Sequence, residues 1–382
     1  MKNNIYINLS AIVNYRKGKM PLEFSEIEKQ GFAPYIDIKL FDRGILSRFA
    51  KCDTKVTLVN KNDVLVVWDG ARFGLSAIGW EGVLGSTIVA LNSQYVLPKF
   101  LFYFIQSNFK KIQSKPRGVG IPHVEPSLFW NLPIPVPPMA EQKRIVKKIE
   151  ELFGVIDEQV KRLEATQEAL VSYRQSILHS LFSSAIGEKV PLEKCLNYLQ
   201  PTPYIVKSTD YMEAGEVPVL TPGKTFILGF TKEKEGIFTN PLPVIIFDDF
   251  TTSTKLIDFP FKVKSSAMKI LLAKEGVDIR YIYYIMQILS CPHDTHKRYW
   301  ISIYAKMRII LPSLPEQKAI VKKIENAFAF ADKAQAAITG ALEQAKQLKQ
   351  SILKRAFEGK LVPQDPNDKP VDLTQIKKDK HK

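Results

Sequence analysis

The chain has 382 residues, of which 45% are hydrophobic, so it is long enough to form two or three domains with buried cores. Its 54 Lys and Arg against 39 Asp and Glu give a formal net charge of +15, which is spread along the whole sequence. This charge favours a polyanionic partner, most simply nucleic acid, although the surface of an ordinary basic protein would also explain it.

Cysteine use and hydropathy argue against a secreted or membrane-spanning protein. The spacings of Cys52, Cys195 and Cys291 fit neither a disulfide framework nor a zinc ribbon, so we expect a reducing cytoplasm. The start, M-K-N-N-I-Y-I-N, lacks the apolar core of a signal peptide, and no apolar run of about 18 residues occurs anywhere. We therefore expect no membrane partner.

Residues 1–138 are predicted to form a mixed, largely β domain. Asp63–Gly70 (D-V-L-V-V-W-D-G) has the pattern of a buried strand that ends in a turn, and Ser86–Leu91 predicts a second strand. Pro98–Lys111 predicts a helix that starts at a proline and carries aromatic residues on one face. The prolines of Asn131–Met139 exclude a central strand or a helix interior, so this segment is a stiff linker.

A repeat then divides the chain into two tandem parts. Glu141–Glu150 reads E-Q-K-R-I-V-K-K-I-E, and 175 positions later Glu316–Glu325 reads E-Q-K-A-I-V-K-K-I-E. The correspondence continues without a gap to Q-S-I-L at Gln175 and again at Gln350. Each copy predicts a helix of about 43 residues, roughly 65 Å long, which is too long for the core of one domain.

The second globular segment repeats the order of elements of the first. Pro243–Asp249 matches the first strand, Ser266–Leu271 the second, and Ile279–Gln287 the aromatic helix, while Ile309–Pro315 repeats the proline linker. Similar scaffolds with different loops indicate two domains that perform the same kind of task on different targets. The predicted divisions are two globular domains at 1–138 and 187–313, two long helices at 139–186 and 314–360, and a basic C-terminal tail at 361–382.

The two long helices carry apolar residues seven positions apart, which is typical of a coiled coil. An ordinary amphipathic helix lying on a domain is the alternative, but about five heptads exceed what a domain of about 130 residues can cover. The heptads fit parallel and antiparallel pairing equally well. The residues expected in this seam and in partner binding are Ile149, Leu152, Ile156, Leu163, Leu170, Ile177, Ile324, Ala331, Ile338, Leu348 and Ile352.

No pattern in the sequence indicates catalysis. T-P-G-K-T at 221–225 resembles the end of a phosphate-binding loop but has Pro where the first glycine is needed. C-P-H-D-T-H at 291–296 lacks a second pair of ligands for a metal, so we interpret it as a loop. Asp248 and Asp249 could hold a metal in a nuclease, yet the Thr and Ser residues that follow favour a polar loop. We expect no catalytic residue, no metal site and no bound cofactor.

Basic loops in both domains are the candidates for DNA contact. Arg suits bidentate contacts to guanine and Lys suits phosphates, and glycines such as those of K-P-R-G-V-G at 115–120 permit close backbone approach. A solvated surface is the alternative for each cluster taken alone, but clusters recur at comparable points in both domains. The expected DNA-binding residues are Arg72, Lys115, Arg117, Lys224, Lys255, Lys264, Lys297 and Arg298.

This arrangement resembles the specificity subunits of type I DNA restriction-modification systems over nearly the whole chain. The most specific part is the duplicated proline linker with E-Q-K-x-I-V-K-K-I-E and Q-S-I-L. The blocks P-V-L-T-P-G-K-T-F-I-L-G-F, V-I-I-F-D-D-F-T-T and K-S-S-A-M-K-I-L also look like a target recognition domain of that family. The first domain resembles it through D-V-L-V-V-W-D-G and G-V-G-I-P-H-V.

The resemblance implies an α+β fold of two target recognition domains, each followed by a long helix, with the helices paired as an antiparallel coiled coil. Each domain would read one half of an asymmetric, bipartite DNA site. Two methyltransferase subunits would dock on the repeated helices, and separate motor/endonuclease subunits would cut DNA. The chain itself would not be an enzyme. A metal-dependent DNA-processing enzyme and a coiled-coil adaptor protein are the alternatives.

Overall fold

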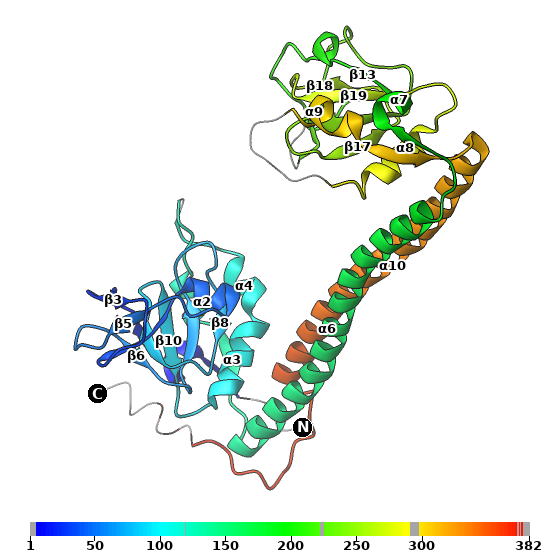
Figure 1. The fold of residues 1–382 in the computed structure, drawn as a ribbon. Helices are drawn as coiled ribbons and strands as arrows, with labels where there is room; N and C mark the ends of the chain where they lie inside the picture. The colour runs from blue at the N-terminus through cyan, green and yellow to red at the C-terminus, as the bar shows by residue number, and fades with distance from the viewer. Residues whose placement is uncertain are drawn as a thin grey trace. The chain divides into compact units, whose positions relative to one another are not determined.

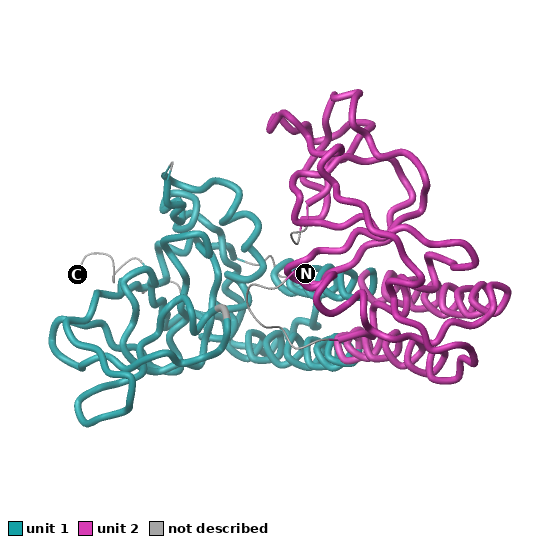
Figure 2. The backbone as a smooth tube through the Cα atoms, turned by 45° about the horizontal axis from the view of Figure 1, so that its top comes forward, with its two compact units in different colours: residues 1–162, 340–382 teal, residues 163–339 magenta. Residues whose placement is uncertain are grey.

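The computed structural model describes residues 5–118, 120–221, 225–290, 298–372, 374 and 376, and the chain divides into two compact units. Unit 1 comprises Met1–Arg162 together with Gly340–Lys382, and unit 2 comprises Leu163–Thr339 (Figure 2). Each unit therefore contains one globular domain and parts of both long helices. Within the described ranges, none of the helices combines the length and the apolar character that a membrane crossing requires.

The globular domain of unit 1 is built on two sheets (Figure 1). The first is antiparallel in the order β2-β10-β7-β8, the second has the order β3-β5-β4-β9-β6, and β1 pairs with β11. The elements are β1 Tyr6–Asn8, α1 Leu9–Ile12, β2 Asn14–Lys17, β3 Phe24–Ser25, β4 Phe32–Ile36, α2 Ile38–Arg43, β5 Phe49–Lys51, β6 Leu58–Val59, β7 Val64–Val67, β8 Ser76–Ala77, β9 Gly82–Leu84, β10 Ile88–Asn92, α3 Pro98–Ser107, α4 Phe109–Gln113, α5 Pro126–Trp130 and β11 Pro133–Pro135.

The domain of unit 2 repeats the first sheet with different additions. Its order β13-β19-β16-β17 matches β2-β10-β7-β8 strand for strand, and β12 pairs with β20 as β1 pairs with β11. Unit 2 adds a three-stranded sheet, β15-β14-β18, whereas unit 1 adds a sheet of five strands. The elements are β12 Glu188–Pro191, α7 Leu192–Cys195, β13 Leu196–Leu199, a 3-10 turn η1 Thr202–Tyr204, β14 Val217–Leu220, β15 Ile227–Thr231, β16 Val244–Asp248, β17 Thr254–Ile257, β18 Lys262–Val263, β19 Met268–Ala273, α8 Ile279–Met286, α9 Tyr299–Ser302, η2 Tyr304–Lys306 and β20 Arg308–Leu311.

The central strands are buried because they are apolar on both faces. β7 and β16 are fully buried along their length, and each lies between two neighbours of its sheet. The aromatic helices α3 and α8 turn their apolar faces into the domain core, where Phe100 and Tyr281 are completely buried. These positions correspond in the repeat, so both cores are closed in the same way.

Two long helices, α6 Met139–Ser183 and α10 Leu314–Phe357, pack side by side (Figure 1). Two ion pairs fix their direction, Asp157 with Lys349 in unit 1 and Arg174 with Asp332 in unit 2. Along α6 the paired residue number rises from 157 to 174, whereas along α10 it falls from 349 to 332. The two helices are therefore antiparallel. The α+β fold with an antiparallel helix pair is thus confirmed.

The two ion pairs are copies of one interaction. Asp332 is the repeat counterpart of Asp157, and Lys349 is the counterpart of Arg174. Each cation also lies over a ring, Lys349 at 5.0 Å from the centroid of Phe153 and Arg174 at 5.1 Å from that of Phe328. A duplicated antiparallel pair thus makes the same contacts in each unit.

The predicted seam is mostly enclosed, with one exception. Leu348 is 52% exposed and lies outside the enclosed part of the seam, while its role in partner binding stays a prediction. The next residue, Lys349, makes the contact with Phe153 and Asp157 instead, and the helix turns Leu348 toward solvent. The other members are buried or half-buried: Ile149, Leu152, Ile156, Leu163, Leu170, Ile177, Ile324, Ala331, Ile338 and Ile352.

A buried glutamine joins each domain to its long helix. Gln142, near the start of α6, is 0% exposed, accepts from the Leu97 backbone N–H at 2.8 Å and donates to the carbonyls of Tyr95 at 3.1 Å and Pro137 at 2.9 Å. Its counterpart Gln317 accepts from the N–H of Asp278 at 2.8 Å and donates to the carbonyls of Gly276 and Pro312 at 3.2 and 2.9 Å. Leu97 and Asp278 are the N-cap residues of the aromatic helices.

Aromatic contacts complete this junction in both units. Tyr103 packs edge-on against Phe153 at 5.7 Å, and its counterpart Tyr284 packs in the same way against Phe328 at 5.7 Å. Burial, together with the nearby carboxylates of Glu150 and Asp157, raises the pKa of Tyr103 to about 12, so its hydroxyl stays protonated. The sequence repeat therefore extends to the way in which each domain is attached.

Candidate nucleic-acid interface

An aspartate just beyond the central strand organises the basic loop of unit 1. The Asp69 carboxylate pairs with Lys17 at 2.9 Å and is 2.8 Å from Nδ1 of His123. The backbones of Arg117 and His123 exchange two hydrogen bonds of 3.0 Å, so the chain doubles back at this point. Asp69 therefore holds the base of the loop that carries Arg117.

Three of the predicted DNA contacts lie at this base. Gly70 donates to the carbonyl of Pro122 at 2.8 Å, which joins the turn containing Arg72 to the loop of Lys115 and Arg117. All three cations have exposed side chains. Gly118 has a φ of 95°, and a Cβ there would stand 2.8 Å from the Ile121 carbonyl oxygen, so glycine permits the turn. The structure brings Arg72, Lys115 and Arg117 to one edge of the domain.

Unit 2 uses the corresponding aspartate for the same purpose. The carboxylate of Asp249 is buried, 3.5 Å from the buried ammonium of Lys269, and accepts from the Trp300 N–H at 2.8 Å. The Tyr299 N–H donates to the backbone carbonyl of Asp249 at 3.1 Å. These bonds fix the start of α9, where the N-cap residue Arg298 is exposed.

The remaining predicted cations of unit 2 lie on different parts of the domain. Lys264 follows β18, and its loop reaches Asp249, whose N–H donates to the carbonyl of Ala267 at 3.2 Å. The loops of Lys264 and Arg298 therefore both contact Asp249. Lys255 is exposed on the edge strand β17, away from these bonds. Lys224 and Lys297 lie outside the described residues.

The two adjacent carboxylates of unit 2 are occupied by hydrogen bonds. Asp248 accepts from the Phe250 N–H at 2.9 Å and from the hydroxyl of Thr251, which closes the turn after β16. The Asp249 carboxylate pairs with the Lys269 ammonium and accepts a hydrogen bond from the Trp300 N–H. Over the parts of the chain that the structure describes, no cluster of His, Cys, Asp and Glu has the makings of a metal site. The segment 291–296 lies outside the described residues.

Some residues of this surface were not predicted from the sequence. Tyr15 on β2 is 60% exposed and Tyr198 on β13 is 42% exposed, and these two positions correspond between the sheets. Tyr15 packs against Trp130 in a tilted arrangement with ring centroids 5.0 Å apart, and the Lys269 ammonium lies 6.0 Å from the centroid of the Tyr198 ring. Lys17, His123 and both tyrosines could have been found only by aligning the two domains strand by strand.

The comparisons with known proteins agree with this architecture. The family model described as "Type I restriction modification DNA specificity domain" matches residues 1–165. The chain is 43% identical over 162 residues to the EcoR124I/EcoR124II specificity subunit of Escherichia coli, covering 39% of this chain and 40% of that one. It is 32% identical over 193 residues to the MjaVIII specificity subunit of Methanocaldococcus jannaschii, covering 49% and 44%. These matches therefore span less than half of the length of the two relatives.

A solved structure extends the likeness to nearly the whole fold. The chain aligns with a protein from a study titled "Structural basis underlying complex assembly and conformational transition of the type I R-M system", with a TM-score of 0.71 and 18% identity, over 94% of this chain and 99% of that one. This likeness shows a common fold of two domains with the same central sheet and an antiparallel helix pair. Part of the chain is thus similar in sequence to the specificity subunits of type I restriction enzymes.

Proposed function

We propose that this chain is the sequence-specific DNA-recognition subunit of a type I restriction-modification complex. Each globular domain reads one half of a bipartite, asymmetric site, and two copies of a methyltransferase subunit dock through the repeated helices. The chain is not itself catalytic. S-adenosylmethionine and ATP chemistry belong to the methyltransferase and to motor/endonuclease subunits, and the complex acts on DNA in the cytoplasm.

One observation carries the proposal: each domain holds a basic loop against an aspartate at the end of the same central strand. Asp69 supports the loop of Arg117, and Asp249 supports the loops of Arg298 and Lys264. The scaffold is common, while the residues that the loops present are different. Such a pair suits the reading of two unlike half-sites, because scaffold contacts position a domain and loop side chains select bases.

A salt titration of DNA binding tests the proposal. The full chain, assembled with its methyltransferase, should bind duplex DNA with an affinity that falls steeply as salt rises, because each neutralised phosphate releases counterions. Arg117→Ala should weaken binding, by about 1 to 3 kcal/mol if it contacts a base or with a salt slope smaller by about one if it contacts a phosphate. Lys55→Ala, an exposed cation elsewhere in unit 1, is the matched control.

Two outcomes would favour other functions. Metal-dependent cleavage of DNA by the chain alone would support a DNA-processing enzyme. Binding to protein partners with no salt-dependent affinity for DNA would support a coiled-coil adaptor. A flat response to salt in the assembled complex contradicts DNA recognition.

A further inference from the structure

A groove of about 500 Å³ lies in unit 1 where the globular domain meets the first turns of α6. Its apolar lining includes the half-buried side chains of Ile78 and Leu97 and the buried Val146. The exposed cations Lys61, Lys99, Lys143 and Lys147 also line it. The groove therefore combines apolar side chains with four exposed ammonium groups.

The charge of this groove is largely uncompensated. Its one lining carboxylate, Glu150, forms an ion pair with Lys99. Within the described part of the chain, no ion pair is formed by Lys61, Lys143 or Lys147. Three ammonium groups beside an apolar surface attract carboxylates or phosphates.

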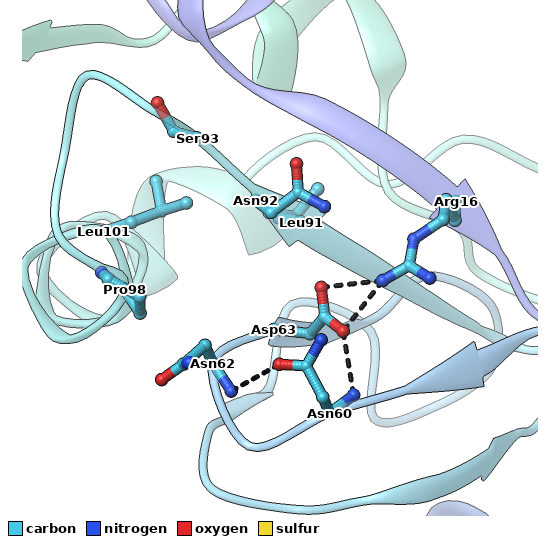
Figure 3. A pocket seen from close by; sticks show the side chains of 9 residues that line it. All are labelled: Arg16, Asn60, Asn62, Asp63, Leu91, Asn92, Ser93, Pro98 and Leu101. Atoms are coloured by element: carbon cyan, nitrogen blue, oxygen red, sulfur yellow. Dashed lines mark hydrogen bonds and ion pairs between the residues drawn. The ribbon is translucent and has the colours of Figure 1, made fainter.

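The outer wall of the groove is held rigidly. Figure 3 shows the neighbouring pocket, in which the guanidinium of Arg16 donates to both oxygens of the Asp63 carboxylate at 2.7 Å. Asp63 also accepts from the Asn60 N–H at 2.9 Å, and the Asn60 side chain accepts from the Asn62 N–H at 2.9 Å. The loop that presents Lys61 is thus fixed before any partner binds, which lowers the entropic cost of binding.

The helical side of the groove occurs twice in the chain. Lys143, Val146, Lys147 and Glu150 on α6 correspond to Lys318, Val321, Lys322 and Glu325 on α10, with no change of residue. Glu325 pairs with Arg280 at 2.8 Å, as Glu150 pairs with Lys99. A surface that is repeated unchanged beside divergent loops suits two copies of one partner better than two different DNA sequences.

We propose that this groove, and the face of α10 that carries Lys318, Val321 and Lys322, each bind an acidic segment of the methyltransferase subunit that carries an apolar side chain between carboxylates. The inference rests on the proposed function, and it names the surface and the chemistry of the docking. A protein segment is favoured over DNA because the lining includes Ile78, Leu97 and Val146, against which a phosphate backbone would bury no apolar group. The lysines would pair with the flanking carboxylates.

Charge reversal with a count of bound subunits tests this docking. The full chain carrying Lys143→Glu and Lys147→Glu is mixed with the methyltransferase and weighed by native mass spectrometry. We expect one bound methyltransferase where the parent binds two, with an affinity at the altered groove at least about tenfold weaker. Lys318→Glu with Lys322→Glu should remove the other copy, and all four changes together should remove both. Lys55→Glu, with the same charge change outside the groove, should leave two copies bound.

The outcomes separate the docking surface from the proposed function. If the variant with all four Lys→Glu changes binds two methyltransferase copies at the parental affinity, the groove proposal is overturned and the recognition function stands. A variant that keeps both copies but binds DNA less tightly would assign the lysines to phosphates, which also overturns it. A parent chain that binds no methyltransferase would overturn the proposed function itself and the groove with it. Because the four lysines are exposed, the variants should retain the parental thermal transition, and Lys→Gln versions replace any that do not.

Discussion

Replacing Gln142 with alanine should loosen the globular domain of unit 1 from its long helix. The side chain makes three hydrogen bonds, to Leu97 N–H, Tyr95 O and Pro137 O, and it is completely buried. Each buried group left without a partner costs about 1 to 3 kcal/mol. We therefore expect the local opening free energy to fall by about 3 kcal/mol or more, and Leu97 amide exchange to accelerate by about two powers of ten.

Hydrogen exchange followed residue by residue measures this effect. Gln317→Ala should produce the same loss at the Asp278 amide of unit 2, because that N–H is bound in the same way. Gln159→Ala, at an exposed position of α6, should leave both amides protected. Unchanged protection of Leu97 in Gln142→Ala would refute the view that this glutamine fastens the domain to the helix.

Three further predictions concern recognition, spacing and pH. Arg298→Ala should relax base preference by about 1 to 3 kcal/mol in the second half-site only, and Arg117→Ala should do so in the first half-site only. Profiling of methylated sites would show whether either change affects both half-sites. One heptad inserted after Glu164 and another after Thr339 keep the seam in phase. The gap between the half-sites should then grow by about 10 Å, roughly three base pairs. An unchanged gap in an active variant would contradict a spacer role. Burial raises the pKa of Glu141 above its ordinary 4.5, so its ionisation destabilises the native state increasingly as pH rises above 4.5, and the full cost applies above the raised pKa. The free energy of unfolding of Glu141→Gln should therefore exceed that of the parent increasingly as the pH rises above 4.5. Urea unfolding across a pH series would measure this difference.

The long-range repeats were predictable from sequence because their period and length leave few alternatives. β7 and β16 lie within the two apolar runs predicted as buried strands, and α3 and α8 begin where Pro98 and Ile279 predicted. The direction of the helix pair did not follow from the heptads, since both pairings bury the same residues. It is the placement of charges such as Arg174 opposite Asp332 that distinguishes them in the structure.

The candidate DNA surface was predicted less completely. Asp69 and His123 are 54 residues apart in the chain, and no local pattern indicates that their side chains meet. The five-stranded sheet of unit 1 contains strands of two and three residues, too short for an alternating pattern to appear. Cations were identifiable as a residue type, whereas the aspartates that hold their loops depend on tertiary pairing.

The duplicated glutamine junction has a consequence for the evolution of such proteins. The side chains of Gln142 and Gln317 form hydrogen bonds with backbone atoms only, namely one N–H and two carbonyl oxygens in each unit. A connector of this kind does not depend on the side chains of the domain that it holds. Under the proposed function, exchange of one domain for another preserves this backbone connection, provided that the aromatic contact made by Tyr103 or Tyr284 is kept with it.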